Sequence, residues 1–117
     1  MFKKYISWCA VVWIYLLSFN LYAAEDGTGW RKIVDIGCHN VDAICFVTLD
    51  GPSFGTNLSC PVSQTNEFRF DNNDTPIGRR TFAALLAAYL SGKKVAVSLE
   101  GCSIQGYPLI KYFHISD

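Results

Sequence analysis

Residues 74–94 read DTPIGRRTFAALLAAYLSGKK and contain the clearest helix signal in the chain. Thr75 is placed to cap the helix, and Pro76 follows as its first residue, where a missing N–H costs nothing. Gly92 is suited to end the helix, and the two lysines after it complement the negative end of the helix dipole. The body, residues 77–90, carries one broad apolar stripe at helical spacing, formed by Ile77, Ala84, Leu85, Ala88 and Tyr89.

Short strand patterns lie on both sides of this helix. Three precede it, over residues 30–38, 43–50 and 67–71, and two follow it, over residues 94–100 and 107–115. The order β-β-β-α-β-β is that of the OB-fold, a small Greek-key barrel. A ferredoxin-like sandwich would need a second helix, for which the chain gives no signal. We therefore expect a mainly β protein with one helix, built as a five-stranded OB-like barrel.

The same patterns predict which side chains share a face of a strand. In the first strand, alternation puts Trp30 on one face with Val34, Ile36 and Cys38. Residues 24–29 are small and polar and are expected to form a loose leader. Residues 51–65 are rich in Gly, Pro, Ser, Asn and Gln, which predicts a long loop.

The N-terminus has the layout of a secretory signal peptide. Lys3 and Lys4 form a positive start, an apolar run covers residues 5–21, and small residues follow at Ala23 and Ala24. Cleavage after Ala23 removes residues 1–23 and leaves residues 24–117 as a single domain. The apolar run is shorter than the roughly 20 residues of a spanning helix, so an uncleaved anchor is the less favoured alternative. We expect a secreted or periplasmic protein without a membrane span after cleavage.

Four cysteines remain after cleavage, at positions 38, 45, 60 and 102. An even number in a small exported domain predicts two disulfides, with three possible connectivities. A hairpin that turns at residues 40–43 would bring Cys38 opposite Cys45, at a separation that a cross-strand bridge can span. We therefore favour Cys38–Cys45 together with Cys60–Cys102, the second of which would tether the 51–65 loop.

The C-terminal half resembles a group of small exported bacterial proteins, most of them uncharacterised. The resemblance lies in the TPxGrxxxaxLLAA helix at residues 75–88, the Ser-Gly-Lys-Lys-Val turn at 91–95, the Glu-Gly-Cys loop at 100–102 and the closing Tyr-Pro-x-x-x-Tyr at 107–112. It implies an OB-like fold, and a mid-chain cysteine that accompanies the Gly-Cys cysteine supports Cys60–Cys102. The architecture is more distantly similar to the B subunits of subtilase-cytotoxin-like and pertussis-like toxins, which form pentamers and bind cell-surface glycans. That analogy concerns the fold alone.

Composition and motifs argue against several function classes. Without Lys3 and Lys4 the chain has eight basic and ten acidic residues (8 − 10 = −2), so a basic face for nucleic acid is not expected. The candidate metal ligands, Cys38, His39 and His114, lack ligand spacing, and no G-x-S-x-G elbow marks a nucleophile. We expect no catalytic residue, no metal site and no cofactor, hence a protein that is not an enzyme.

Aromatic side chains are the candidates for a binding surface. Phe54, in the glycine-containing loop, is the best candidate for an exposed ring, and Trp30 and Tyr107 are the next. Tyr112, like Trp30, is equally compatible with the core. Two hypotheses follow: an exported binding module for a glycan or protein surface, which could form a homo-oligomer, or a monomeric periplasmic protein with a structural or accessory role.

Overall fold

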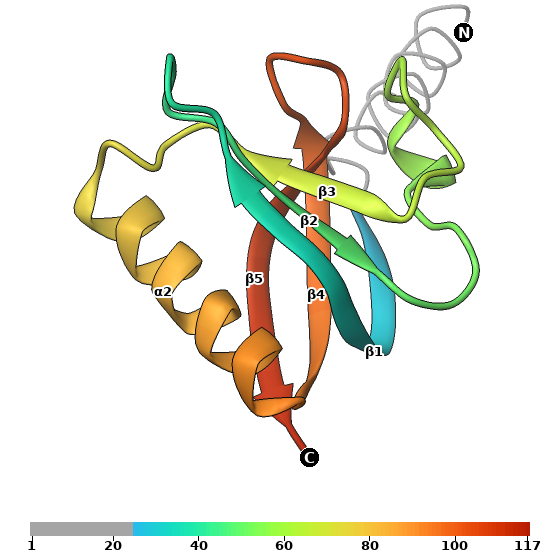
Figure 1. Ribbon diagram of the computed structural model, residues 1–117. Coiled ribbons are helices and arrows are strands. Elements are labelled where there is room, and N and C mark those ends of the chain that lie inside the picture. Colours follow the sequence, from blue (N-terminus) through green and yellow to red (C-terminus); the bar gives the residue numbers. More distant parts are fainter. Residues whose placement is uncertain (1–24) are drawn as a thin grey trace, which may run out of the picture.

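The structure is a computed structural model that describes residues 25–117. The predicted signal peptide, residues 1–23, lies outside the described residues. Figure 1 shows a mainly β architecture with one α-helix between the third and fourth strands, which confirms the predicted element order. The elements are β1 (Glu25–Cys38), β2 (Cys45–Leu49), the short 3-10 helix η1 (Thr56–Leu58), β3 (Glu67–Phe70), α2 (Pro76–Ser91), β4 (Lys94–Cys102) and β5 (Pro108–Ser116).

The five strands form one sheet that closes into a ring in the order β1-β2-β3-β5-β4. The ring closes because β1 is long: its first half pairs with β4 and its second half with β2, both antiparallel. The weakest junction is between β3 and β5, which are parallel and share a single residue pair, Arg69 with Leu109. Among residues 25–117, no helix is long and apolar enough to cross a membrane.

The first strand differs from its prediction in two ways. It begins at Glu25 and includes the residues expected to form a loose leader. Two bulges, between Gly27 and Trp30 and between Ile33 and Asp35, also interrupt its pairing. Each bulge inserts one residue and shifts the alternation. The predicted common face is therefore wrong: Trp30 and Val34 are 53% and 52% exposed, whereas Ile36 and Cys38 pack against the core. Ile33 is buried in place of Val34.

The core fills the interior of the ring, and α2 covers part of it. Val47, Phe68, Val95 and Leu99 are fully buried on the strands, and Leu85 is their counterpart on α2. The helix begins and ends as predicted: the Thr75 hydroxyl accepts the Gly78 N–H, and Gly92 at φ 68° donates its N–H to the last carbonyls. Only the centre of the predicted stripe is buried, because Ile77 (59% exposed) and Tyr89 (42%) extend beyond the core.

The loop at residues 51–65 folds over one end of the ring. Phe54, expected to be exposed, is 4% exposed and belongs to the core, so that prediction is wrong. The loop is held by the backbone pairing of Phe54 with Thr65 and by the Cys60–Cys102 disulfide. Both predicted disulfides are present, with Cα–Cα distances of 4.0 Å for Cys38–Cys45 and 5.7 Å for Cys60–Cys102.

Candidate binding surface

Exposed aromatic side chains gather on the outer face of β1, β4 and β5. Strand register places Trp30 opposite Ala96, and Ala96 opposite His114, in one row across the three strands. The next row contains Gly27, Ser98 and Tyr112. Since these residues follow the sheet's alternation, their side chains point away from the core, which Val95 and Val97 fill from the other side.

The three rings of this face form a continuous series. The Trp30 and His114 ring centroids are 6.5 Å apart, and those of Tyr112 and His114 are 5.6 Å apart with the rings nearly perpendicular. These separations are typical of favourable aromatic pairs. Trp30 and Tyr112 nevertheless remain 53% and 51% exposed. We call Trp30, Ala96, Ser98, Tyr112 and His114 the aromatic face.

A shallow hollow of about 460 Å³ adjoins two of these rings, Tyr112 and His114. Its floor is made of small residues, since glycines from β1 and Ala96 and Ser98 from β4 leave space between larger neighbours. Tyr112 and His114 form one side, and Glu25 and Asp26 contribute carboxylates. The hollow thus combines exposed ring surface, a hydroxyl, an imidazole and two carboxylates.

The two carboxylates are held by different contacts. Asp26 accepts the Gly27 N–H at 2.8 Å and the Gly55 N–H at 3.0 Å, so its position is set by β1 and the covering loop. Glu25 pairs with the Lys111 ammonium, which also lies 2.9 Å from Glu100. The hydrogen bond to Glu25, which has the larger effect, and the hydrogen bond to Glu100 raise the pKa of Lys111 above its usual value. Lys111 is therefore a fixed positive charge beside the hollow.

Buried Thr28 sets the backbone beneath the aromatic face. Its hydroxyl accepts the Val97 N–H at 3.0 Å and donates to the Gly29 carbonyl at 2.8 Å. The first bond replaces a backbone bond that the bulge between Gly27 and Trp30 removes from the ladder. Thr28 consequently stabilises the bulge that turns Trp30 outward.

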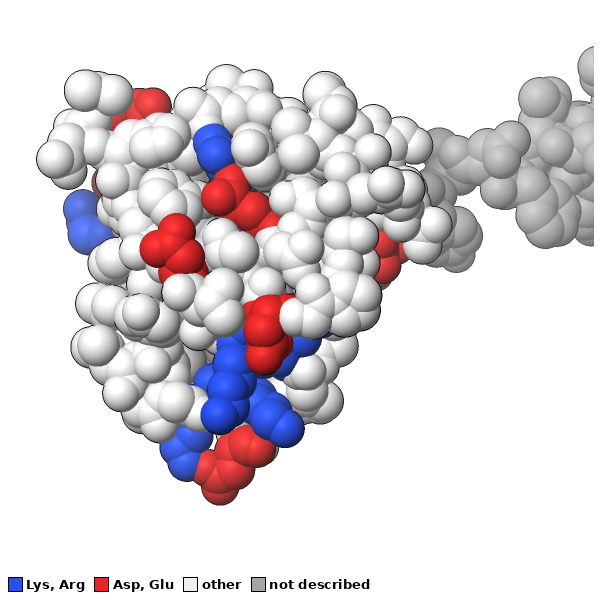
Figure 2. All heavy atoms as spheres, turned by 45° about the vertical axis from the view of Figure 1, so that its right-hand side comes forward, with Lys and Arg blue, Asp and Glu red and all other residues white. Residues whose placement is uncertain are grey.

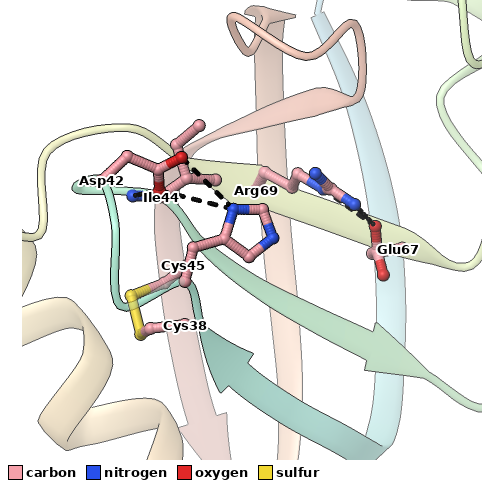
Figure 3. A network of polar contacts seen from close by, with 7 residues as sticks. Cys38, Asp42, Ile44, Cys45, Glu67 and Arg69 are labelled. Carbon is pink, nitrogen blue, oxygen red and sulfur yellow. Dashed lines mark hydrogen bonds and ion pairs between the residues drawn. A yellow bond between two sulfur atoms is a disulfide. The ribbon is translucent and has the colours of Figure 1, made fainter.

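Tyr107, the third predicted binding residue, lies in a different cluster. The Arg69 guanidinium is 3.8 Å from the centroid of its ring and 5.9 Å from that of Phe46. Arg69 also forms an ion pair with Glu67 at 2.8 Å, and Figure 3 shows these two side chains together on β3. Because Arg69 is the β3 residue that pairs with β5, this cluster reinforces the weakest junction of the ring.

A second set of polar contacts in Figure 3 lies at the turn between β1 and β2. Asp42 accepts the Ile44 N–H at 3.0 Å, and one of its oxygens lies 3.4 Å from Nδ1 of His39. The Cys38–Cys45 disulfide closes the base of this turn. His39 is thus engaged at the turn by Asp42, and no group of three or more potential metal ligands occurs in the part of the chain that the structure describes.

The structure therefore separates the three predicted binding residues. Trp30 lies on the aromatic face, Phe54 in the core and Tyr107 in the Arg69 cluster. Sequence reasoning named Tyr112 as a ring that could lie on the surface or in the core, without assigning it to the binding surface, and it did not select His114 as a binding residue. Their spacing of two in a strand-like segment was a usable signal, because it puts both on one face.

The distribution of charged side chains on the surface does not indicate a particular class of partner. On the face of the molecule in Figure 2, uncharged atoms predominate, and Lys and Arg gather mainly at the lower end, beside acidic side chains. That face has no continuous basic track of the kind that follows a phosphate backbone. Comparison with protein-family models, curated proteins and solved structures finds no match for this chain.

Proposed function

We propose that this protein is an exported, non-enzymatic binding module of OB-like architecture, and that its aromatic face recognises a glycan. The OB-like assignment is supported by the ring order β1-β2-β3-β5-β4 and by the single helix between β3 and β4. Export is supported by two disulfides, which persist in oxidising compartments, and by the leader pattern of residues 1–23.

The observation that carries the glycan proposal is the pair of half-exposed rings, Trp30 and Tyr112, on either side of His114. Tyr112 and His114 also border a hollow with a floor of small residues. Large exposed aromatic surface is unfavourable in water unless a partner covers it. A sugar ring has an apolar C–H face that can cover such rings, and hydroxyls at its edge that need hydrogen-bond partners. Ser98, His114 and Glu25 offer such partners at the hollow. The combination of apolar surface with a few polar groups is typical of small-molecule sites.

The test is a glycan array on the mature, oxidised protein, followed by calorimetry with the best ligand. We expect the Trp30→Ala and Tyr112→Ala variants to bind each about tenfold more weakly, equivalent to about 1.4 kcal/mol. Val41→Ala is the matched control, because Val41 is 93% exposed at the β1–β2 turn, away from the aromatic face. Ligand binding that survives both aromatic substitutions would reject the aromatic face as the site.

The native mass, measured by light scattering, separates the remaining alternatives. A pentamer-sized species would support the similarity to toxin B subunits and the proposed homo-oligomer. A monomer that binds no glycan on the array would favour the structural or accessory role instead. A monomer that binds a glycan would support the binding function and reject the homo-oligomer.

A further inference from the structure

The junction between β3 and β5 leaves one strand edge open. The two strands pair only at Arg69 and Leu109, and β5 continues from there to Ser116. On its other side β5 pairs with β4 along its length. Within residues 25–117, positions 110–116 therefore have no strand partner on the side toward β3 and α2. Such an edge presents N–H and C=O groups to which another extended chain can bind.

A groove of about 470 Å³ runs beside this edge. One wall is β5 at residues 109–113, and the other is the first part of α2, with Ile77, Arg80 and Thr81. Apolar side chains line much of it, including Leu109, Ile110 and Phe113, and Ile77 is 59% exposed at its rim. Figure 1 shows α2 and β5 as neighbours below the point where β3 leaves the sheet.

Two charged side chains of the groove, Asp71 and Arg80, differ in their exposure and partners. Asp71, where β3 ends, accepts the Ile104 N–H at 2.8 Å with one oxygen, while its buried Oδ1 has no hydrogen-bond partner among the described residues. Arg80 is exposed and makes no ion pair or hydrogen bond within the described part of the chain. Its neighbour Arg79, by contrast, donates to the Asp74 carbonyl.

We propose that this groove binds a short extended peptide of another protein, which adds to β5 as a strand and places an acidic side chain against Arg80. Backbone hydrogen bonds to a sheet edge supply affinity in this mode, and side-chain contacts supply specificity. The seven positions 110–116 extend over about 23 Å at ~3.3 Å per residue, which suits a peptide of about six residues.

A single extended chain fits this site better than a second folded copy. The groove is bounded by β5 on one side and by α2 on the other. A strand that belongs to a folded sheet would bring its own neighbours and would have to displace α2. The charge of the rim selects the peptide further, because Arg80 would attract an acidic side chain and repel a basic one.

The experiment uses two acetylated, amidated and fluorescently labelled peptides, TVEVTV and TVKVTV, with the mature oxidised protein. Fluorescence anisotropy should show that TVEVTV binds and that TVKVTV binds at least tenfold more weakly. Hydrogen exchange should show new protection at amides of residues 110–116. Failure of both peptides to bind below 1 mM (about −4.1 kcal/mol), or new protection confined to β1 and β4, would overturn the proposal.

Matched variants locate the contacts. Arg80→Glu should reverse the preference between the two peptides, whereas Arg79→Glu should leave it unchanged. Ile77→Ser should weaken both peptides, because it removes apolar contact from the groove without adding charge. Leu90→Ser, at a residue 74% exposed near the other end of α2, should leave both unchanged. Trp30→Ala should have no effect, which separates this site from the glycan site. An unchanged preference in Arg80→Glu would contradict the assigned role of Arg80.

Discussion

Replacing Gly78 with alanine should destabilise the protein, although alanine is the better helix former. Gly78 is buried in the first turn of α2, against the segment that connects β3 to the helix. A Cβ at this position would lie 2.7 Å from the Asn73 Cα and closer still to the Asn72 carbonyl. Both are backbone atoms, so no side-chain rotation can relieve the overlap.

The Asn72 carbonyl cannot move without loss, because it accepts the Thr75 N–H at 2.9 Å and the Thr75 hydroxyl at 2.7 Å. Thr75 in turn caps the helix through Gly78. Overpacking costs about 1–3 kcal/mol and a disturbed cap about 1 kcal/mol, against a propensity gain of at most about 1 kcal/mol. The net expectation is a loss of about 2 kcal/mol, equivalent to a Tm lower by roughly 8–16 °C.

Urea unfolding of the oxidised protein, followed by circular dichroism, measures this change. The control is Ala83→Gly at an exposed position of the same helix, which should lose only the propensity difference of about 1 kcal/mol. If Gly78→Ala were as stable as the unsubstituted protein, the backbone contact would not limit this position, and the reasoning would be refuted.

Three further predictions concern the sheet and its staples. Thr28→Val should cost about 1–3 kcal/mol, because the buried Val97 N–H loses its acceptor, and Thr28→Ser should restore most of the stability in the same urea assay. Tyr107→Leu should cost about 0.5–2 kcal/mol through the lost cation–π contact, and hydrogen exchange should show faster opening between β3 and β5; uniform exchange would contradict this role. In the chain-entropy model, removing Cys60–Cys102 costs about 4 kcal/mol and removing Cys38–Cys45 roughly 2.5 kcal/mol. The double-alanine variant without Cys60–Cys102 should therefore unfold at a lower urea concentration than the one without Cys38–Cys45, and the reverse order would count against a loop-entropy origin.

Local chemistry explains why much of the fold was predictable. The helix is marked at both ends, by Thr75 with Pro76 and by Gly92, and these signals act over a few residues in any tertiary context. The Cys38–Cys45 bridge followed from the hairpin for the same reason, since a short turn brings its flanking residues together. The order of the elements along the chain then followed from the position of this one helix between the third strand and the fourth.

The candidate sites depended on contacts that no short segment specifies. Phe54 is buried because its loop folds over the end of the ring, although the loop's composition indicates an exposed segment. The two bulges of β1 turn Trp30 outward, and pairing across β4 brings it to His114 from the far end of the chain. The groove beside β5 likewise exists because β3 leaves the sheet after one residue pair.

The sequence alone thus determined the helix, the order of the main elements and the Cys38–Cys45 bridge, because capping, alternation and hairpin closure are local interactions. The Cys60–Cys102 bridge, between residues 42 apart, then followed as the remaining pair. Only the tertiary structure decided which rings are exposed and which strand edge is open. Those properties depend on register, bulges and loop packing, which arise from the mutual fit of distant segments rather than from the residues of one segment.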